Sequence, residues 1–183
     1  MQLKAGLTVD RDKMKKELKS LSKIQHSIKG LEKLLENPNY TYSPELDSLF
    51  RPVYGMKEIK FNKAFYEDLK TSGIQLLKNE SLKEKVVTLF EDNYAELIGL
   101  GSFEMHVNEL IRPYYLTNFK DIVFSVYANP IDYEKIWKDP YFKKIRNYRY
   151  ITLEFNHIAH FNRSIKDIDL LLANIDIYLK EKK

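Results

Sequence analysis

The sequence predicts an all-α protein, an antiparallel bundle of three long helices with short helices between them. Apolar residues recur at steps of three and four over three long stretches, which is the spacing of one helix face. Glycine and proline number only 6 each among 183 residues, which is few for a sandwich or barrel with many turns. The chain is 44% hydrophobic and 31% charged, so we expect a folded core rather than disorder or a membrane-embedded bundle. We expect one domain, 1–183, with residues 1–8 disordered or foreign to the natural chain.

The first long helix is expected over residues 10–37. Thr8 fits its N-cap, because a threonine hydroxyl can accept a hydrogen bond from the first turn. Asn37-Pro38 ends it, because the residue before a proline avoids the helical conformation. Its apolar stripe consists of Met14, Leu18, Leu21, Ile24, Ile28, Leu31 and Leu35.

The second long helix is expected over residues 81–116. Ser81 and Glu84 fit a capping box, in which each side chain bonds the other's backbone N–H. Gly99 and Gly101 lie inside the pattern and indicate a kink or a close crossing of another helix. The three-four rhythm runs through Leu82, Val86, Leu89, Asn93, Leu97 and Leu100.

The third long helix, 140–181, has the most regular pattern in the chain. Asp139 fits its N-cap and Pro140 its first turn. The pattern predicts a coiled-coil-like seam that packs along both other long helices. The seam consists of Ile145, Tyr148, Ile151, Phe155, Ile158, Phe161, Ile165, Ile168, Leu172, Ile175 and Leu179.

Shorter elements are expected between the long helices. A short helix ends at Ser72-Gly73, where glycine can adopt a left-handed cap. Asn129-Pro130 fits the cap of a helical turn that follows it. The stretches 53–61 and 122–127 have β-character, and they either pair into a minor two-stranded ribbon or leave 122–127 as a buried helical end.

The charge balance gives a weak indication of an anionic partner. Lys and Arg total 30 against 26 for Asp and Glu, a formal charge of +4, whereas nucleic-acid binders usually have a larger, clustered excess. Solvated helix faces are the simpler interpretation, and nucleic acid is an unlikely partner. An anionic surface would meet Lys13, Lys16, Lys143, Lys144 and Arg146.

Cysteine is absent, which excludes disulfides, thiolate metal sites and cysteine nucleophiles. The sequence contains no apolar run of about 18 residues that would span a membrane. Met1 to Gly6 are not followed by the apolar region of a signal peptide. We therefore expect either a cytosolic protein or a fragment of a protein whose N-terminal membrane anchor has been removed.

A single cluster resembles a metal site. Glu154 and His157 form a Glu-x-x-His pair, half of the pattern that di-iron bundles use, and His160 follows one turn later. The second pair is missing, since Glu104, His106 and Glu109 of the second helix have another spacing. The seam would place Glu154 on its flank and turn His160 away. We therefore expect no metal, no cofactor and no catalytic residue. A metal protein or enzyme using Glu154, His157 and a residue of the second helix is the alternative.

An aromatic group precedes and opens the third helix, and it either closes the end of a bundle core or lines a small-molecule pocket. The core role is the more common one for aromatic residues in this position. The group consists of Tyr114, Tyr115, Phe119, Phe124, Tyr127, Tyr133, Trp137, Tyr141 and Phe142.

The order of short motifs resembles a family of single-pass membrane proteins from Bacteroidota that contain a domain of unknown function. The likeness rests on Leu-Glu-Lys-Leu-Leu at 31–35, on the stretch from Leu69 to Leu82, and on Asp139 to Phe142. The resemblance implies a membrane helix upstream of Met1, and the positive-inside rule would then place these residues on the periplasmic face of the inner membrane. It supplies no catalytic residues. This sequence departs from the family in lacking the apolar span.

These observations predict a helical interaction or sensory module without catalysis. It is expected to form a homodimer or to bind another protein through its helix faces, and to contact a membrane only through the upstream anchor. It is extracytoplasmic if the resemblance holds, and cytoplasmic otherwise.

Overall fold

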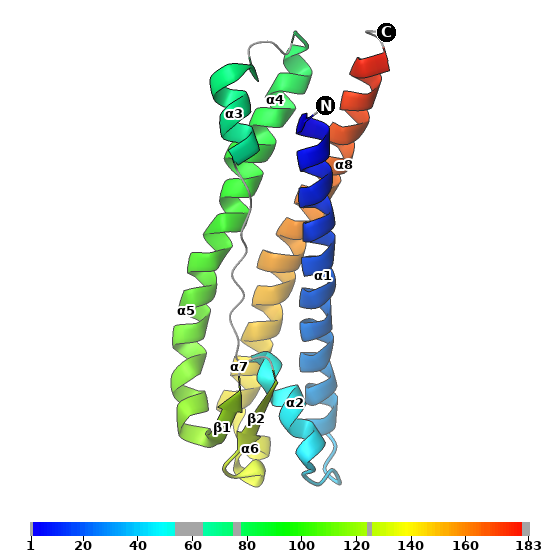
Figure 1. Ribbon diagram of the computed structural model, residues 1–183. Coiled ribbons are helices and arrows are strands. Elements are labelled where there is room, and N and C mark those ends of the chain that lie inside the picture. Colours follow the sequence, from blue (N-terminus) through cyan, green and yellow to red (C-terminus); the bar gives the residue numbers. More distant parts are fainter. Residues whose placement is uncertain (1, 54–63, 75–77, 124–125, 181–183) are drawn as a thin grey trace. The chain divides into compact units, whose positions relative to one another are not determined.

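The computed structural model describes residues 2–53, 64–74, 78–123 and 126–180, and most of them are helical (Figure 1). The predicted all-α fold with a minor two-stranded ribbon is confirmed. The main helices are α1 (Gln2–Leu35), α4 (Glu80–Thr88), α5 (Tyr94–Asn118), α7 (Pro140–Thr152) and α8 (Ala159–Lys180).

Two π-helices join pairs of these helices. η4 (Leu89–Asn93) connects α4 to α5, and η5 (Leu153–Ile158) connects α7 to α8. The predicted helices 81–116 and 140–181 are therefore continuous helical runs, each with one wide turn. A π turn inserts an extra residue and rotates the faces that follow it, and such turns often occur at functional sites.

The chain divides into two compact units. Unit 1 contains Met1–Lys19, Ile59–Leu100 and Ile158–Lys183, and unit 2 contains Ser20–Glu58 and Gly101–His157. The expectation of one domain over 1–183 stays a prediction.

Unit 1 is built from the first part of α1, from α4 with the start of α5, and from α8. Lys4 pairs with Asp176 at 2.5 Å and Arg11 with Asp169 at 3.3 Å, so α1 and α8 run antiparallel. The hydroxyl of Tyr94 joins α5 to α1. The buried side chains of the three helices include Leu7, Met14, Leu82, Val86, Leu89, Leu97, Phe161, Ile165, Ile168, Leu171 and Ile175. On α3 (Ala64–Ser72), which ends at Ser72 as predicted, Tyr66 stacks on Phe90.

Unit 2 combines the second part of α1 with α5 and α7, around an aromatic core. The ring of Tyr115 stacks on Phe119 at 4.3 Å between centroids, and Tyr114 stacks on Phe142 at 5.5 Å. The aromatic residues of this group that are described thus pack mainly on one another and on Phe50 of α2 (Asp47–Phe50), which supports the core role. Phe124 lies outside the described residues.

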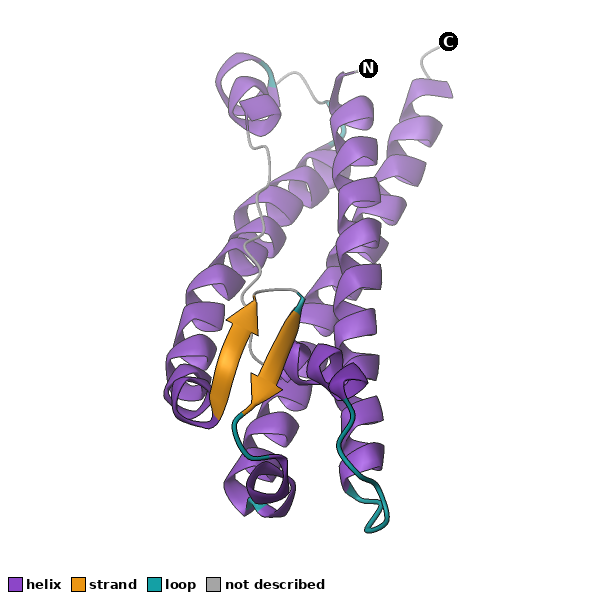
Figure 2. Ribbon diagram, turned by 60° about the horizontal axis from the view of Figure 1, so that its bottom comes forward, coloured by secondary structure: helices purple, strands orange, loops and turns teal. Residues whose placement is uncertain are grey.

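The ribbon is a hairpin within unit 2, formed by β1 (Phe119–Val123) and β2 (Tyr127–Pro130), which pair antiparallel (Figure 2). The prediction pairs 122–127 with 53–61. This pairing is wrong for the residues of β1, because β1 pairs with β2. Val53 belongs to the 3-10 helix η2 (Arg51–Val53), which follows η1 (Pro44–Leu46) and α2, and 54–61 lie outside the described residues.

Three helix starts differ from the prediction, and at two of them another side chain supplies the cap. Residues 2–8 are helical rather than disordered, and Thr8 donates to the carbonyl of Lys4 instead of capping. Asn79 rather than Ser81 caps α4, since its Oδ1 accepts from the Leu82 N–H at 2.9 Å. Asp132 rather than Asn129 caps α6 (Tyr133–Lys138), because Asn129 lies in β2.

The predicted close crossing at Gly99 and Gly101 is also wrong. A Cβ at either glycine would meet no atom within 4 Å. The irregularity of this helical run is instead the π-helix η4, which ends just before α5 begins.

The predicted seam is wrong at three of its five positions in α7 and η5, while Ile145 and Ile158 are buried as predicted. Tyr148, Ile151 and Phe155 are exposed, Phe155 to 67%, whereas Arg149 and His157 are buried. The prediction assumes regular helical spacing from α8 back into α7. The π-helix η5 adds one residue to the turn, so two of the predicted positions in α7, Tyr148 and Ile151, are displaced by one residue from the buried ones. The core of α7 therefore combines Ile145, which the apolar pattern selected, with Arg146, Arg149 and Thr152, which it did not.

Candidate functional site

A buried polar cluster in unit 2 joins α5 to α7 and η5. The carboxylate of Glu104 accepts a hydrogen bond from Nη1 of Arg149 at 2.8 Å and forms an ion pair with Nη2 of the same guanidinium at 2.5 Å. Its Oε2 also lies 2.8 Å from Nε2 of His157. All three side chains are almost fully buried, which is unusual for charged residues unless they are paired. The cluster is thus an internally neutralised group in a helical core.

The charge of Glu104 is stabilised by its partners. Burial alone would raise its pKa, but the hydrogen bonds from His157 and Arg149 outweigh burial and hold the pKa below its usual value. Nδ1 of His157 has no hydrogen-bond partner among the described residues. The arrangement fixes one carboxylate and orients one imidazole between two helices.

The predicted metal candidates are not brought together. Glu154 accepts a hydrogen bond from Gln25 of α1, and His157 faces Glu104. His160 belongs to unit 1, where its Nε2 lies 3.8 Å from Glu96. Within the described part of the chain, no three His, Cys, Asp or Glu side chains gather in a way that would hold a metal.

One member of the proposed anion-binding surface is buried. Arg146 is 6% exposed and lies over the ring of Phe142 at 5.3 Å, so it cannot contribute to a surface. Burial lowers its pKa, and the charges of Glu32 and Glu36 oppose that change. The inclusion of Arg146 was therefore wrong, while Lys13, Lys16, Lys143 and Lys144 are exposed.

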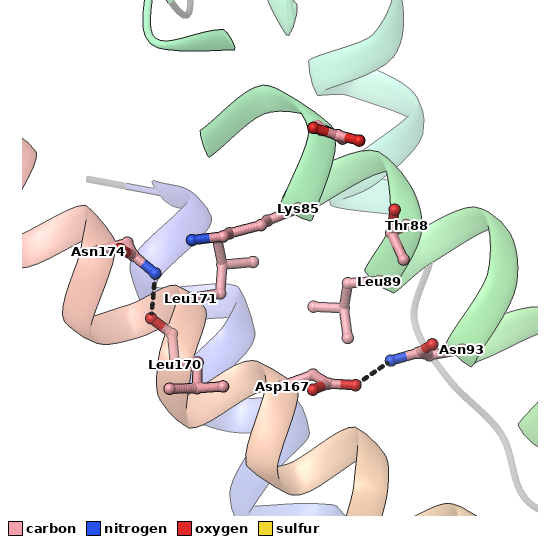
Figure 3. Close-up of a pocket in the computed structure, with 9 residues that line it drawn as sticks. Lys85, Thr88, Leu89, Asn93, Asp167, Leu170, Leu171 and Asn174 are labelled. Atoms are coloured by element: carbon pink, nitrogen blue, oxygen red, sulfur yellow. Dashed lines mark hydrogen bonds between the residues drawn. The ribbon is translucent and has the colours of Figure 1, made fainter. Parts of the chain in front are cut away.

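A pocket of about 400 Å³ lies in unit 1, between α4 with η4 on one side and α8 on the other (Figure 3). Its volume lies within the range of about 300 to 1,000 Å³ that is typical of small-molecule sites. The π-helix η4 supplies two of its residues, Leu89 and Asn93. The lining consists of Glu84, Lys85, Thr88, Leu89, Asn93, Asp167, Leu170, Leu171 and Asn174.

The pocket has one polar end fixed by a hydrogen bond between two helices. Nδ2 of Asn93 donates to Oδ2 of Asp167 at 2.7 Å, and Asn93 is 8% exposed. Figure 3 shows this pair at one end, Lys85 beside Asn174 at the other, and Leu89 and Leu171 between them. The sequence contains one signal for this site: Asn93 is a polar residue at a position of the second helix where the three-four rhythm calls for an apolar one. No binding role is assigned to it from the sequence.

A smaller hollow of about 120 Å³ shares Lys85 and Asn174 with the pocket. Asn79, Ser81 and Tyr178 contribute polar groups to it. The two hollows together form a groove between α4 and α8 in which amide and hydroxyl groups recur. We call this groove the α4–α8 groove.

Comparisons with known proteins add no assignment. No protein-family model, no curated protein and no solved structure matches this chain. Among the described residues, no helix is both long enough and apolar enough to cross a membrane.

Proposed function

We propose that the protein is a non-catalytic helical sensory or interaction module that binds a small ligand in the pocket of unit 1. The observation that carries the proposal is the construction of this pocket. It combines a ligand-sized volume and an apolar floor of Leu89 and Leu171 with polar groups at both ends. Small-molecule sites typically have this combination of apolar walls and a few placed polar groups.

The chemistry of the lining favours binding over reaction. The polar lining consists of two amides, one hydroxyl and the charged side chains of Glu84, Lys85 and Asp167. The carboxylate of Asp167 is fixed by an amide rather than by a hydroxyl or imidazole that it could activate. The pocket joins α4 and η4 to α8 within one unit, so a ligand would cross-link two helices and stabilise them. A module of this kind reports ligand binding through its helices.

A library screen with a blocked variant tests this proposal. We expect compounds of amino-acid to dipeptide size to shift backbone amide NMR resonances of η4 and of 167–174. Thr88 lines the pocket and is exposed, so Thr88→Trp should fill the pocket and abolish these shifts. Ala95 is exposed on α5 and does not line the pocket, so Ala95→Trp serves as the matched control. Equal shifts in both variants, or none in the wild type, would contradict the proposal.

The exposed side chains of α7 and η5 favour a second function, self-association. Tyr148, Ile151 and Phe155 lie at helical spacing, and all are at least 40% exposed. We name these three residues the α7 ridge. Two copies of one apolar ridge can bury each other in a two-fold dimer. Sedimentation equilibrium should show a dimer that Phe155→Ser weakens and that Tyr127→Ser, outside the ridge, does not; a monomer at all concentrations excludes it.

The resemblance to the Bacteroidota membrane-protein family supports a further proposal, that the module lies outside the cytoplasm behind an upstream anchor. Alkaline phosphatase fused behind Lys183 of the full natural gene would be active if this placement is right. Activity of a cytoplasmic reporter at the same position would exclude it.

A further inference from the structure

We infer that the pocket of unit 1 binds a primary ammonium group that carries an aliphatic chain. The inference rests on the proposed binding function and deepens it, because it names the chemical class of the ligand. It starts from the three charged side chains of the lining, Glu84, Lys85 and Asp167, which differ in their exposure to solvent.

The charges of Glu84 and Lys85 offset each other. The two residues are adjacent on α4, carry opposite charges and are both exposed. Water and salt screen exposed charges, so this pair adds no net charge to the pocket and attracts ligands of either sign only weakly. Asp167 is half-buried, and it is therefore the charged residue of the lining that a bound ligand meets with the least screening.

Asp167 forms no ion pair with a described residue. Its carboxylate accepts one hydrogen bond, from the neutral amide of Asn93 at 2.7 Å. Arg163 lies one turn earlier on α8 but pairs with Glu96 of α5 instead. A half-buried carboxylate whose hydrogen-bond donor is neutral is stabilised further by a cation beside it. This end of the pocket therefore suits a positively charged group.

Asn93 offers a second acceptor at the same end of the pocket. Its Nδ2 donates to Asp167, so its amide oxygen remains to accept a hydrogen bond from a ligand. An ammonium group has three N–H donors, so it can donate to the carboxylate and to the amide oxygen together. A carboxylate or phosphate group would meet two acceptors here and be repelled.

Apolar side chains beside this end suit an aliphatic chain. Leu171 follows Asp167 by one turn of α8, which is about 6 Å along the helix axis. Figure 3 shows Leu89 and Leu171 between Asp167 and Lys85. A chain of butyl to hexyl length would cover these leucines while its ammonium group stays at Asp167. At the other end, the ammonium group of Lys85 lies beside Asn174, which disfavours a second cation there (Figure 3).

Probes of equal chain length separate the charge from the apolar contact. Hexylamine carries an ammonium group, hexanol is neutral, and hexanoate is an anion. Titrations of the whole chain followed by NMR should show hexylamine binding at least about tenfold more tightly than the other two, since a hydrogen bond to a charged group contributes about that much. Hexamethylenediamine should bind no more tightly than hexylamine, because its second ammonium group would approach Lys85.

A further pair of probes distinguishes two sources of the same ammonium group. Butylamine represents a free amine, and Nα-acetyllysinamide represents a lysine side chain of a protein, with the same alkylammonium group. Tighter binding of Nα-acetyllysinamide would assign the site to a lysine side chain, and tighter binding of butylamine would assign it to a free amine. Either result supports an ammonium site.

Variants assign the ammonium group to one carboxylate. Asp167→Asn should reduce hexylamine binding about tenfold and leave hexanol binding unchanged, and it keeps an oxygen to which Asn93 can donate. Two controls should leave hexylamine binding unchanged: Glu84→Gln, an exposed acid of the lining, and Asp92→Asn, an exposed acid of η4 outside the lining. Equal losses in all three variants would show a general attraction to surface charge and would overturn the inference.

The outcomes distinguish this inference from the function on which it rests. If hexanol or hexanoate binds as well as hexylamine, or if the diamine binds more tightly, the inference of a single ammonium group fails and the binding module stands. If neither these probes nor a broad library shifts the resonances of η4, both proposals fail. Thermal melts show whether a variant loses binding through unfolding, and the probe series on the wild type decides the inference without the variants.

Discussion

His157 Nε2 lies 2.8 Å from Oε2 of Glu104, although the two residues are 53 positions apart in the chain. The same carboxylate receives both outer nitrogens of Arg149. One buried carboxylate on α5 therefore pairs with a guanidinium on α7 and forms a hydrogen bond with an imidazole on η5. Because a buried charge without a partner is costly, the three residues depend on one another.

Replacing the shared acid should expose this dependence. We expect Glu104→Gln to lower the free energy of unfolding by about 3 kcal/mol or more, because the buried guanidinium of Arg149 loses its counter-charge. Glu109→Gln is the control, since Glu109 is exposed one turn and a half later on α5 and should change stability by less than about 0.5 kcal/mol. Urea denaturation of both variants measures the difference, and equal midpoints would contradict the prediction.

The lowered pKa of Glu104 predicts how stability depends on pH. An acid whose pKa is lower in the folded state stabilises the fold above its unfolded pKa, about 4.3, and that contribution is lost as the pH falls through the folded value. The wild type should therefore lose stability relative to Glu104→Gln below about pH 4.3.

The pH dependence of stability has to be compared between the wild type and Glu104→Gln, because Asp10 also titrates with a shifted pKa. Burial raises the pKa of Asp10, so this residue changes stability with pH in the opposite direction. Subtracting the unfolding profile of Glu104→Gln from that of the wild type removes the contribution of Asp10. A difference between the two profiles that stays constant from pH 3 to pH 6 would show that Glu104 does not titrate as described.

The helices could be predicted from the sequence because their causes are local. The cap at Asp139 was predicted because its oxygen bonds an N–H two residues later, and the end of α1 lies within two residues of Asn37. Apolar residues at steps of three and four give long helices whatever their neighbours are. The partner of β1 depended on strand pairing, which the local sequence did not determine. The cap at Asp132 bonds an N–H three residues later and is as local as that at Asp139, but the prediction chose Asn129 instead.

The sites could be predicted only in part because they depend on distant partners. Glu104 and His157 are considered as metal candidates from the sequence, but no local pattern links Arg149 to them, and the π turn of η5 has no clear local signature. Asn93 gave a usable signal, a polar side chain in an apolar rhythm. That Lys85 and Asp167 lack ion-pair partners while Lys83 and Asp169 have them is a consequence of packing.

A second buried polar contact gives a prediction for unit 1. The hydroxyl of Tyr94 donates to Oδ2 of Asp10 at 2.9 Å, and both side chains are buried. Tyr94→Phe should lower the free energy of unfolding by about 1–3 kcal/mol, because it leaves a buried carboxylate without this donor. Tyr148→Phe, on an exposed side chain, should have little effect. Denaturation at pH 7 compares them, and a Tyr94→Phe variant as stable as wild type would contradict the contact.

The corrected seam gives the last prediction, from two phenylalanines six residues apart on one helical run. Phe161 is fully buried, whereas Phe155 is 67% exposed. Phe161→Ala should therefore cost about 3–5 kcal/mol by leaving a cavity, while Phe155→Ala should change stability by less than about 0.5 kcal/mol. A regular seam would make both substitutions costly, because both side chains would lie in the core. Urea denaturation separates these outcomes at low protein concentration, where the proposed self-association through the α7 ridge does not contribute. Equal losses of stability in the two variants would support the regular seam and contradict the register shift at η5.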